Sequence, residues 1–82
     1  MENQNLYMMA VLLDKRNLEA PEVQKVFTKY GDCILSRLGI HECAETNGLI
    51  SLNIKSTDEY MKQFESELES IRGVSVKHML LQ

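Results

Sequence analysis

The stretch YGDCILSRLGI, residues 30–40, changes from a helical pattern to a strand pattern at Gly31. Up to Gly31, four apolar residues recur at the i, i+3, i+4 and i+7 positions of one helix face: Val23, Val26, Phe27 and Tyr30. After it, three apolar residues alternate at strand spacing and predict one buried face: Ile34, Leu38 and Ile40. In this pattern Ser36 shares the buried side, Arg37 points away from the helices, and Gly31 ends the helix as a residue able to take a positive φ.

The segments around this stretch extend the same alternation of strands and helices. Residues 6–13 (LYMMAVLL) form a continuous apolar run of strand length, which predicts a strand in the centre of a sheet. Asp14 to Asn17 form a polar loop, and Pro21 suits the first turn of the helix that follows. Asn47-Gly48 is a turn signal before a strand at residues 49–54, so the second and third strands are expected to form a hairpin.

A second helix and a last strand complete the chain. Ser56 and Glu59 fit a capping box at the start of the helix, and Gly73 ends it. The apolar stripe of this helix consists of Tyr60, Met61, Phe64, Leu68 and Ile71. The last strand is predicted from the alternation of Val74, Val76 and His78 with Ser75, Lys77 and Met79.

The order βαββαβ predicts a ferredoxin-like α+β fold, in which two helices cover one face of a four-stranded antiparallel sheet. With 82 residues, the chain is expected to be a single domain, residues 1–82. Its first strand is apolar on both sides, so the face without helices presents either Met8, Ala10 and Leu12 or their neighbours Met9, Val11 and Leu13. We expect this open face to form a homodimer or homotetramer; the alternative is that a half-hydrated sheet tolerates these residues.

Composition excludes several classes of protein. An apolar fraction of 44% with 26% charged residues is ordinary for a globular domain and excludes a disordered chain. The net charge of −3 and the scattered Lys and Arg residues argue against direct binding of nucleic acid. The apolar run at residues 6–13 is too short for a membrane span and no basic segment precedes it, so we expect a cytoplasmic protein without a membrane partner.

Three segments carry a resemblance to a known family: residues 9–16 (MAVLLDKR), 30–40 and 73–77 (GVSVK). Together they resemble the small bacterial family of iron-only hydrogenase system regulators, over roughly residues 6 to 80. That family is related in fold to ACT domains and to the regulatory domain of the nickel-responsive repressor. The resemblance implies an oligomeric, effector-binding module without catalysis. Because the chain has no helix-turn-helix, ribbon or basic face, any gene regulation would need a separate partner.

Four residues are candidates for binding a small-molecule effector. Asp14 and Asn17 belong to the loop at which ACT-like domains receive small molecules, as the resemblance implies, and the helix start there would favour an anionic group. Asp32 could hold a ligand near the helix end, or satisfy backbone N–H groups of its turn. Arg37 could pair with an anionic effector, or with a carboxylate across a dimer interface. A solvated loop explains Asp14 and Asn17 equally well.

His41, Cys43 and His78 offer imidazole and thiolate groups, with Glu42 beside them, and this set suits nickel, zinc or copper. The spacing supplies fewer than the four ligands of a structural zinc site, so a second subunit would have to contribute. The alternative is an exposed hairpin that contains His and Cys without binding metal. Cys33 and Cys43 lack CxxC spacing and a neighbouring base, and are expected to be inert, reduced thiols. The sequence identifies no other cofactor.

No arrangement of nucleophile, base and acid, no phosphate-binding glycine loop and no pair of carboxylates on a common face points to an enzyme. The sequence therefore predicts a non-catalytic regulatory module that binds an effector and works as an oligomer, linked by resemblance to the iron-only hydrogenase system. Two alternatives stay open. One is a structural scaffold that binds other proteins and no small molecule, and the other is a metal sensor that uses His41, Cys43 and His78.

Overall fold

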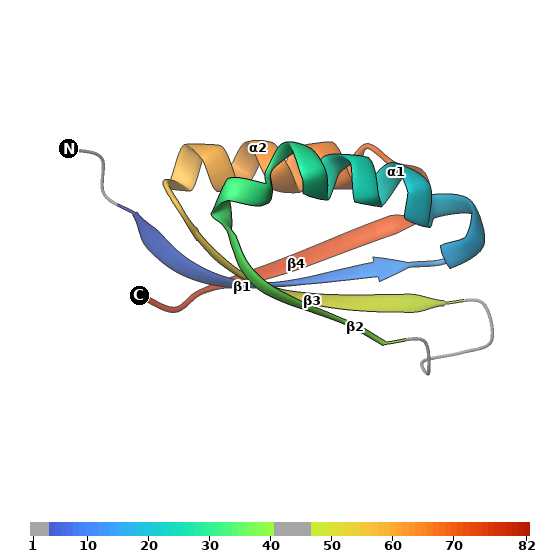
Figure 1. Ribbon diagram of the computed structural model, residues 1–82, viewed down its shortest axis with the longest axis horizontal. Coiled ribbons are helices and arrows are strands. Elements are labelled where there is room, and N and C mark those ends of the chain that lie inside the picture. The colour runs from blue at the N-terminus through green and yellow to red at the C-terminus, as the bar shows by residue number, and fades with distance from the viewer. Residues whose placement is uncertain (1–3, 41–46) are drawn as a thin grey trace.

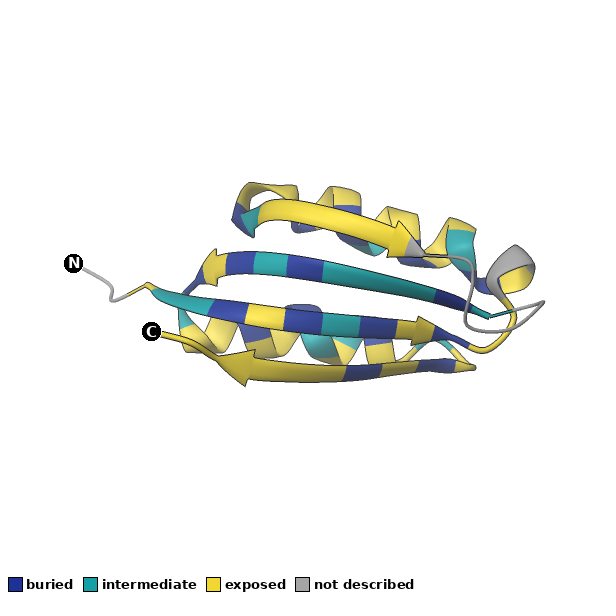
Figure 2. Cartoon of the chain, turned by 90° about the horizontal axis from the view of Figure 1, so that it is seen from below, coloured by how far each residue is buried: buried dark blue, intermediate teal, exposed yellow. Residues whose placement is uncertain are grey.

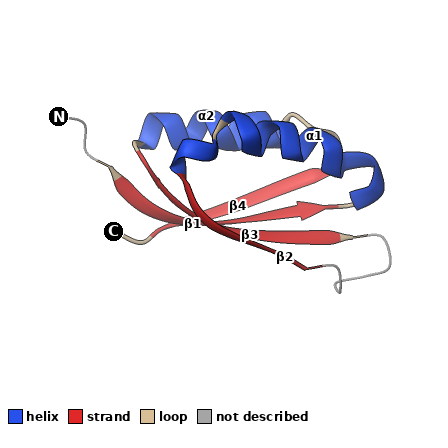
Figure 3. Ribbon diagram, in the orientation of Figure 1, coloured by secondary structure: helices blue, strands red, loops and turns tan. Residues whose placement is uncertain are grey.

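The molecule consists of two layers, a pair of helices and a four-stranded sheet (Figures 1 and 3). The computed structural model describes residues 4–40 and 47–82, without the side chains of residues 16, 17 and 40. Along the chain the elements are β1 (Asn5–Leu13), α1 (Arg16–Lys29), the 3₁₀ helix η1 (Gly31–Cys33), β2 (Ile34–Ile40), β3 (Gly48–Ser56), α2 (Asp58–Glu69) and β4 (Val74–Leu80). This order confirms the predicted ferredoxin-like βαββαβ fold.

The strands are ordered β2-β3-β1-β4, and every neighbouring pair is antiparallel. The apolar first strand thus lies in the centre of the sheet, as predicted from its composition. Both helices lie on the same face of the sheet, so the other face has no layer over it (Figure 1). Among the described residues, no helix is long and apolar enough to cross a membrane.

The core lies between the helices and the sheet. On β1, Met9, Val11 and Leu13 are the residues that face the helices, and each is at most 1% exposed. On α2 the predicted stripe supplies Met61, Phe64 and Leu68, all fully buried. Phe64 stacks on Tyr30 of the α1 end, with ring centroids 4.9 Å apart, and meets Phe27 edge to face. These aromatic contacts join the two helices over the sheet.

A β-bulge in β2 overturns part of the predicted strand pattern. Ile34 pairs with Ile54 and Ser36 pairs with Asn53, so Leu35 is one extra residue with no partner across the ladder. From Ser36 onward the faces are therefore exchanged relative to a regular strand. Leu38 and Ser36 were predicted on the buried side, but both are exposed to solvent, and Leu38 is 64% exposed. Arg37, predicted to point away from the helices, instead contacts α1.

At the helix ends, two predictions were wrong and a third was right in position only. Gly31 follows Tyr30, the C-cap of α1, as predicted, but it has no positive φ, because η1 begins there; among the described residues, only Gly73 has one, at +89°. The N-cap of α2 is Thr57 and not Ser56: the Thr57 hydroxyl accepts a hydrogen bond from the Tyr60 N–H at 3.3 Å. Helix α1 begins at Arg16, which places Pro21 beyond its first turn.

The sheet face without helices, called the open face below, is the surface seen in Figure 2. Cross-strand partners share a face, so the register defines its members. They are Leu6, Met8, Ala10 and Leu12 of β1, Ser36 and Leu38 of β2, Leu49, Ser51, Asn53 and Lys55 of β3, and Ser75, Lys77 and Met79 of β4. Met8, Leu12, Leu38 and Met79 are large apolar side chains that water reaches. The predicted apolar open face is thus present in the fold.

Candidate functional site

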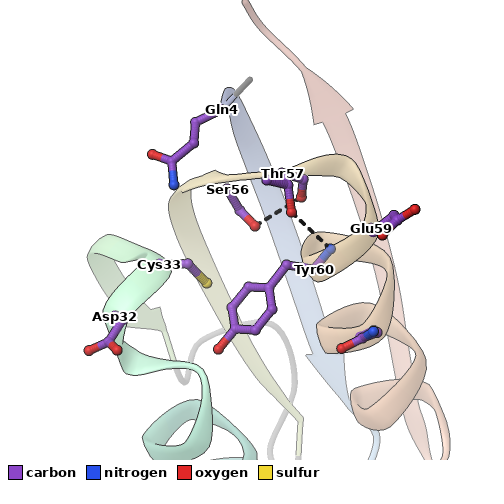
Figure 4. Close-up of a pocket in the computed structure, with 8 residues that line it drawn as sticks. Gln4, Asp32, Cys33, Ser56, Thr57, Glu59 and Tyr60 are labelled. Carbon is purple, nitrogen blue, oxygen red and sulfur yellow. Dashed lines mark hydrogen bonds between the residues drawn. The ribbon is translucent and has the colours of Figure 1, made fainter. Parts of the chain in front are cut away.

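A polar pocket of about 370 Å³ lies where η1, the end of β3 and the first turn of α2 meet (Figure 4). The cap of α2 shapes its wall: Thr57 holds the Tyr60 N–H, and the Ser56 hydroxyl donates to the Thr57 carbonyl at 2.9 Å. Asp32, one of the predicted ligand residues, lines this pocket together with Gln4, Cys33, Ser56, Thr57, Glu59, Tyr60 and Gln63. Its lining has two carboxylates and no Lys or Arg, so the pocket does not favour an anionic ligand.

Cys33 carries the potential nucleophile of this pocket, its thiol, but the surroundings of the thiol disfavour the reactive thiolate. The side chain is 5% exposed, and its Sγ donates to the Tyr30 carbonyl at 3.1 Å. Burial raises the pKa of the Cys33 thiol, because the thiolate would lose solvation. This supports the predicted inert thiol and gives no nucleophile.

The loop that contains Asp14 forms a second pocket, of about 380 Å³, with the turn before β4. The Asp14 N–H donates to the Gly73 carbonyl at 2.9 Å, which ties the loop to that turn. Glu19 is 8% exposed, and its Oε1 accepts from the Lys15 N–H at 3.0 Å. The start of α1 thus already holds a carboxylate of its own, in a pocket that Lys15 and Arg72 also line.

Glu19 is a residue that sequence reasoning missed. The signal for it was weak: Lys15 belongs to the predicted loop, and Glu19 lies four positions later, near the predicted start of the helix. The side chain of Asn17, the other candidate in this loop, is not among those described. A ligand at Asp14 and Asn17 therefore stays a prediction.

Arg37 lies in a third place, a groove between α1 and the edge strand β2, with a volume of about 350 Å³. The groove is lined by Phe27, Thr28, Gly31, Ile34, Ser36 and Arg37. Asp14 precedes α1, whereas Arg37 contacts Gln24 and Phe27 in the second half of this helix. The three predicted ligand residues whose side chains are described, Asp14, Asp32 and Arg37, therefore line three different pockets.

His78, a predicted metal ligand, pairs with a carboxylate of the neighbouring helix. Its Nδ1 lies 2.6 Å from Glu65 Oε2, and its ring meets the Tyr7 ring edge to face at 6.0 Å. His41 and Cys43 lie outside the described residues. Within residues 4–40 and 47–82, no three His, Cys, Asp or Glu side chains are clustered as a metal site would need. The metal site stays a prediction.

A polar network that the sequence did not indicate adjoins His78. The buried Tyr7 hydroxyl donates to Asp58 Oδ1 at 3.1 Å, and Lys62 pairs with Asp58 at 3.0 Å. The Lys62 ammonium and the Tyr7 hydroxyl hold the pKa of Asp58 below its usual value. These contacts join β1 to α2, so the network has a structural explanation.

The chain matches the model of a known family over most of its length. The model of the TM1266-like family, described as "Iron-only hydrogenase system regulator, putative", matches residues 5–78. No curated protein matches the chain significantly.

Several solved structures have the same fold. The uncharacterized protein TM1266 from Thermotoga maritima has a TM-score of 0.91 at 22% identity, over 98% of this chain and 100% of that one. The ACT domain of the GTP pyrophosphokinase of Chlorobium tepidum has a TM-score of 0.74 at 15% identity, over 93% of this chain and 86% of that one. The C-terminal domain of MgtC from Mycobacterium tuberculosis has a TM-score of 0.67 at 11% identity, over 99% and 92%. At these identities the likeness establishes a shared fold.

Proposed function

The chain belongs to the TM1266-like family of iron-only hydrogenase system regulators, and from this premise we propose that it is a non-catalytic regulatory module of the cytoplasm that binds a small effector and works as a homodimer. The observation that carries the proposal is the open face. Four large apolar side chains, Met8, Leu12, Leu38 and Met79, are between 38% and 64% exposed on one continuous sheet surface. Exposed apolar surface of this kind is typical of interaction sites.

The layout of the open face suits a second copy of the chain. Leu6, Met8, Ala10 and Leu12 run along β1, near the middle of the sheet, whereas Lys55 lies near one end of β3 and Lys77 lies on the edge strand β4. An apolar centre with charges at its rim is the usual anatomy of a protein interface. In a face-to-face pair, the lysine stems could cover apolar surface while their ammonium groups stay in water.

The size of this face sets the expected strength of the dimer. Four strands spaced about 4.8 Å apart and roughly 25 Å long give a footprint of about 500 Å² per subunit. Stable interfaces bury about 600 to 1,000 Å² per partner. The dimer should therefore dissociate measurably on dilution.

Analytical ultracentrifugation of the wild type and two matched variants tests the dimer. Met8→Glu places a carboxylate in the centre of the open face, and Leu18→Glu makes a comparable change at an exposed leucine of α1. We expect Met8→Glu to weaken the dimer by about tenfold or more, because the interface would bury an unpaired charge, and Leu18→Glu to leave it unchanged. A wild type that is monomeric at every concentration, or a Met8→Glu dimer of unchanged affinity, would refute the interface.

Effector binding is tested by heat denaturation with panels of amino acids, nucleotides and divalent metals. A ligand at 100 times its Kd stabilises the native state by about 2.7 kcal/mol. In a domain of this size, that raises Tm by about 10 °C or more. A flat response across the panel with an intact dimer would favour the scaffold instead. A shift with metals alone, lost in His78→Ala, would favour the metal sensor.

A further inference from the structure

Arg37 is an exposed side chain that contacts two neutral groups of α1. Its Cζ lies 5.5 Å from the centroid of the Phe27 ring, within the range of a cation–π contact. Its Nη1 donates to Gln24 Oε1 at 3.0 Å. The bulge at Leu35 turns Arg37 toward α1 and so makes both contacts.

These two contacts orient the guanidinium without neutralising it. Among the residues that the structure describes, no carboxylate oxygen lies within 4.0 Å of Arg37, whereas Lys25, Lys29 and Lys62 each have such a partner. The guanidinium carries five N–H donors, and the contact with Gln24 occupies only one of them. An oriented cation with unused donors loses little conformational entropy when it binds an anion.

The rest of the groove supplies apolar surface beside this cation. Phe27 forms its floor and is 3% exposed, and the partly buried Ile34 begins β2 on the other side. Gly31 leaves the end of the groove open, since a Cβ added there would meet nothing within 4 Å. The volume of about 350 Å³ is near the lower limit of small-molecule sites, about 300 to 1,000 Å³.

We propose that this groove is the effector site and that it binds a small monocarboxylate with an apolar body and no amino group, such as a 2-oxo acid or an arylacetate. The inference rests on the proposed regulatory function and gives it a ligand class. Arg37 holds the carboxylate with two parallel N–H donors, which a planar guanidinium provides and a lysine does not. The apolar body lies against Phe27 and Ile34.

Three other pockets fit this ligand less well. In the one beside Tyr30, of about 470 Å³, the Lys29 ammonium is already paired with Glu67 at 2.9 Å. Asp32 and Glu59 line the pocket at the start of α2, and the buried Glu19 lies in the pocket beside Asp14. The pocket at the start of α2 would repel a carboxylate, because its described lining holds no cation. The pocket beside Asp14 also holds Lys15 and Arg72, but neither pocket has an arginine stacked on an aromatic ring among the described residues. The Arg37 groove is therefore the site that charge and shape favour.

Isothermal titration and NMR titration with 4-methyl-2-oxopentanoate and phenylacetate test the site, with phenylacetamide as the neutral control. We expect the wild type to bind at least one carboxylate probe and to prefer phenylacetate over its amide by tenfold or more. Binding should shift the NMR signals of the Phe27 ring and of the Arg37 guanidinium. No binding of any carboxylate probe, or binding without shifts at these two residues, would overturn the proposal.

Variants at Arg37 separate charge from geometry. Arg37→Gln should weaken binding of the carboxylates by tenfold or more and remove the preference for phenylacetate over its amide. Arg37→Lys should retain only part of the wild-type affinity for the carboxylates. Arg72→Gln removes the same charge from an exposed arginine in the turn before β4 and should bind like the wild type. Unchanged binding by Arg37→Gln would overturn the proposal.

The outcome also distinguishes this inference from the function on which it rests. If another class of ligand raises Tm equally in the wild type and in Arg37→Gln, the regulatory function stands and the Arg37 site is wrong. If the carboxylates bind through Arg37 while the wild type stays monomeric, the site stands and the proposed homodimer is wrong.

Discussion

Replacement of Gly73 by alanine should destabilise the protein far more than the same change at Gly31. Gly73 has a φ of +89°, which costs about 1 kcal/mol for an alanine. A Cβ at this position would also collide with the Glu19 carboxylate, with Cδ at 2.8 Å and an oxygen closer still. Moving that carboxylate breaks its hydrogen bond from the Lys15 N–H, which is worth about 1.5 to 3 kcal/mol because the acceptor is charged.

The sum predicts a loss of about 3 kcal/mol in the free energy of unfolding for Gly73→Ala. In a domain of 82 residues, this lowers Tm by roughly 15 °C. Gly31→Ala is the control, because Gly31 has no positive φ and an added Cβ has space. That variant should change stability by less than about 1 kcal/mol, since alanine also restricts the unfolded chain.

A double-mutant cycle separates the two causes. Glu19→Ala removes the colliding carboxylate, so adding Gly73→Ala to it should cost only the backbone part, about 1 kcal/mol. Urea denaturation of the four proteins measures the coupling, expected at about 1.5 kcal/mol or more. The reasoning fails if Gly73→Ala costs no more than Gly31→Ala, or if the two changes are additive.

Three further outcomes follow from the packing and the shifted pKa values. Glu67 accepts hydrogen bonds from the Tyr30 hydroxyl and from Lys29, and both bonds lower the pKa of Glu67. The hydrogen bond to Glu67 and burial raise the pKa of Tyr30 to about 12. The raised pKa of Tyr30 in the folded state gives stability that is present below pH 10 and is lost as the pH rises toward 12. The lowered pKa of Glu67 gives stability that is lost as the pH falls through the folded-state pKa of Glu67. Melting curves against pH should show both losses reduced in Tyr30→Phe, and identical profiles would contradict the assignment. Phe64 is fully buried and contacts two aromatic rings, so Phe64→Ala should lower the free energy of unfolding by about 3 to 5 kcal/mol in urea denaturation. Tyr60→Phe, at a partly exposed position, should lower it by less than about 1.5 kcal/mol. Since Cys33 is buried and burial raises its thiol pKa, mass spectrometry should find slow iodoacetamide labelling of Cys33 in the native protein and rapid labelling in denaturant, and equal rates would show that the site opens.

The candidate site was only partly predictable, and the residues show why. Asp14 and Asp32 were predicted beside helix ends and Arg37 within a strand, and the three line separate pockets. Distance along a sequence does not tell which end of a helix a residue adjoins until the direction of each strand is known. Glu19 gave almost no signal, since its importance comes from Gly73 on a distant turn.

The amino-acid sequence by itself determined the order of strands and helices, the central place of β1 and the apolar stripe of α2. These features follow from the 2.0 and 3.6 residue periods of apolar side chains, which each segment carries locally. Only the tertiary structure decided the side on which Leu38 and Arg37 lie and the contact between Glu19 and Gly73. The register of β2 depends on its pairing with β3, where one unpaired residue exchanges the two faces of everything that follows.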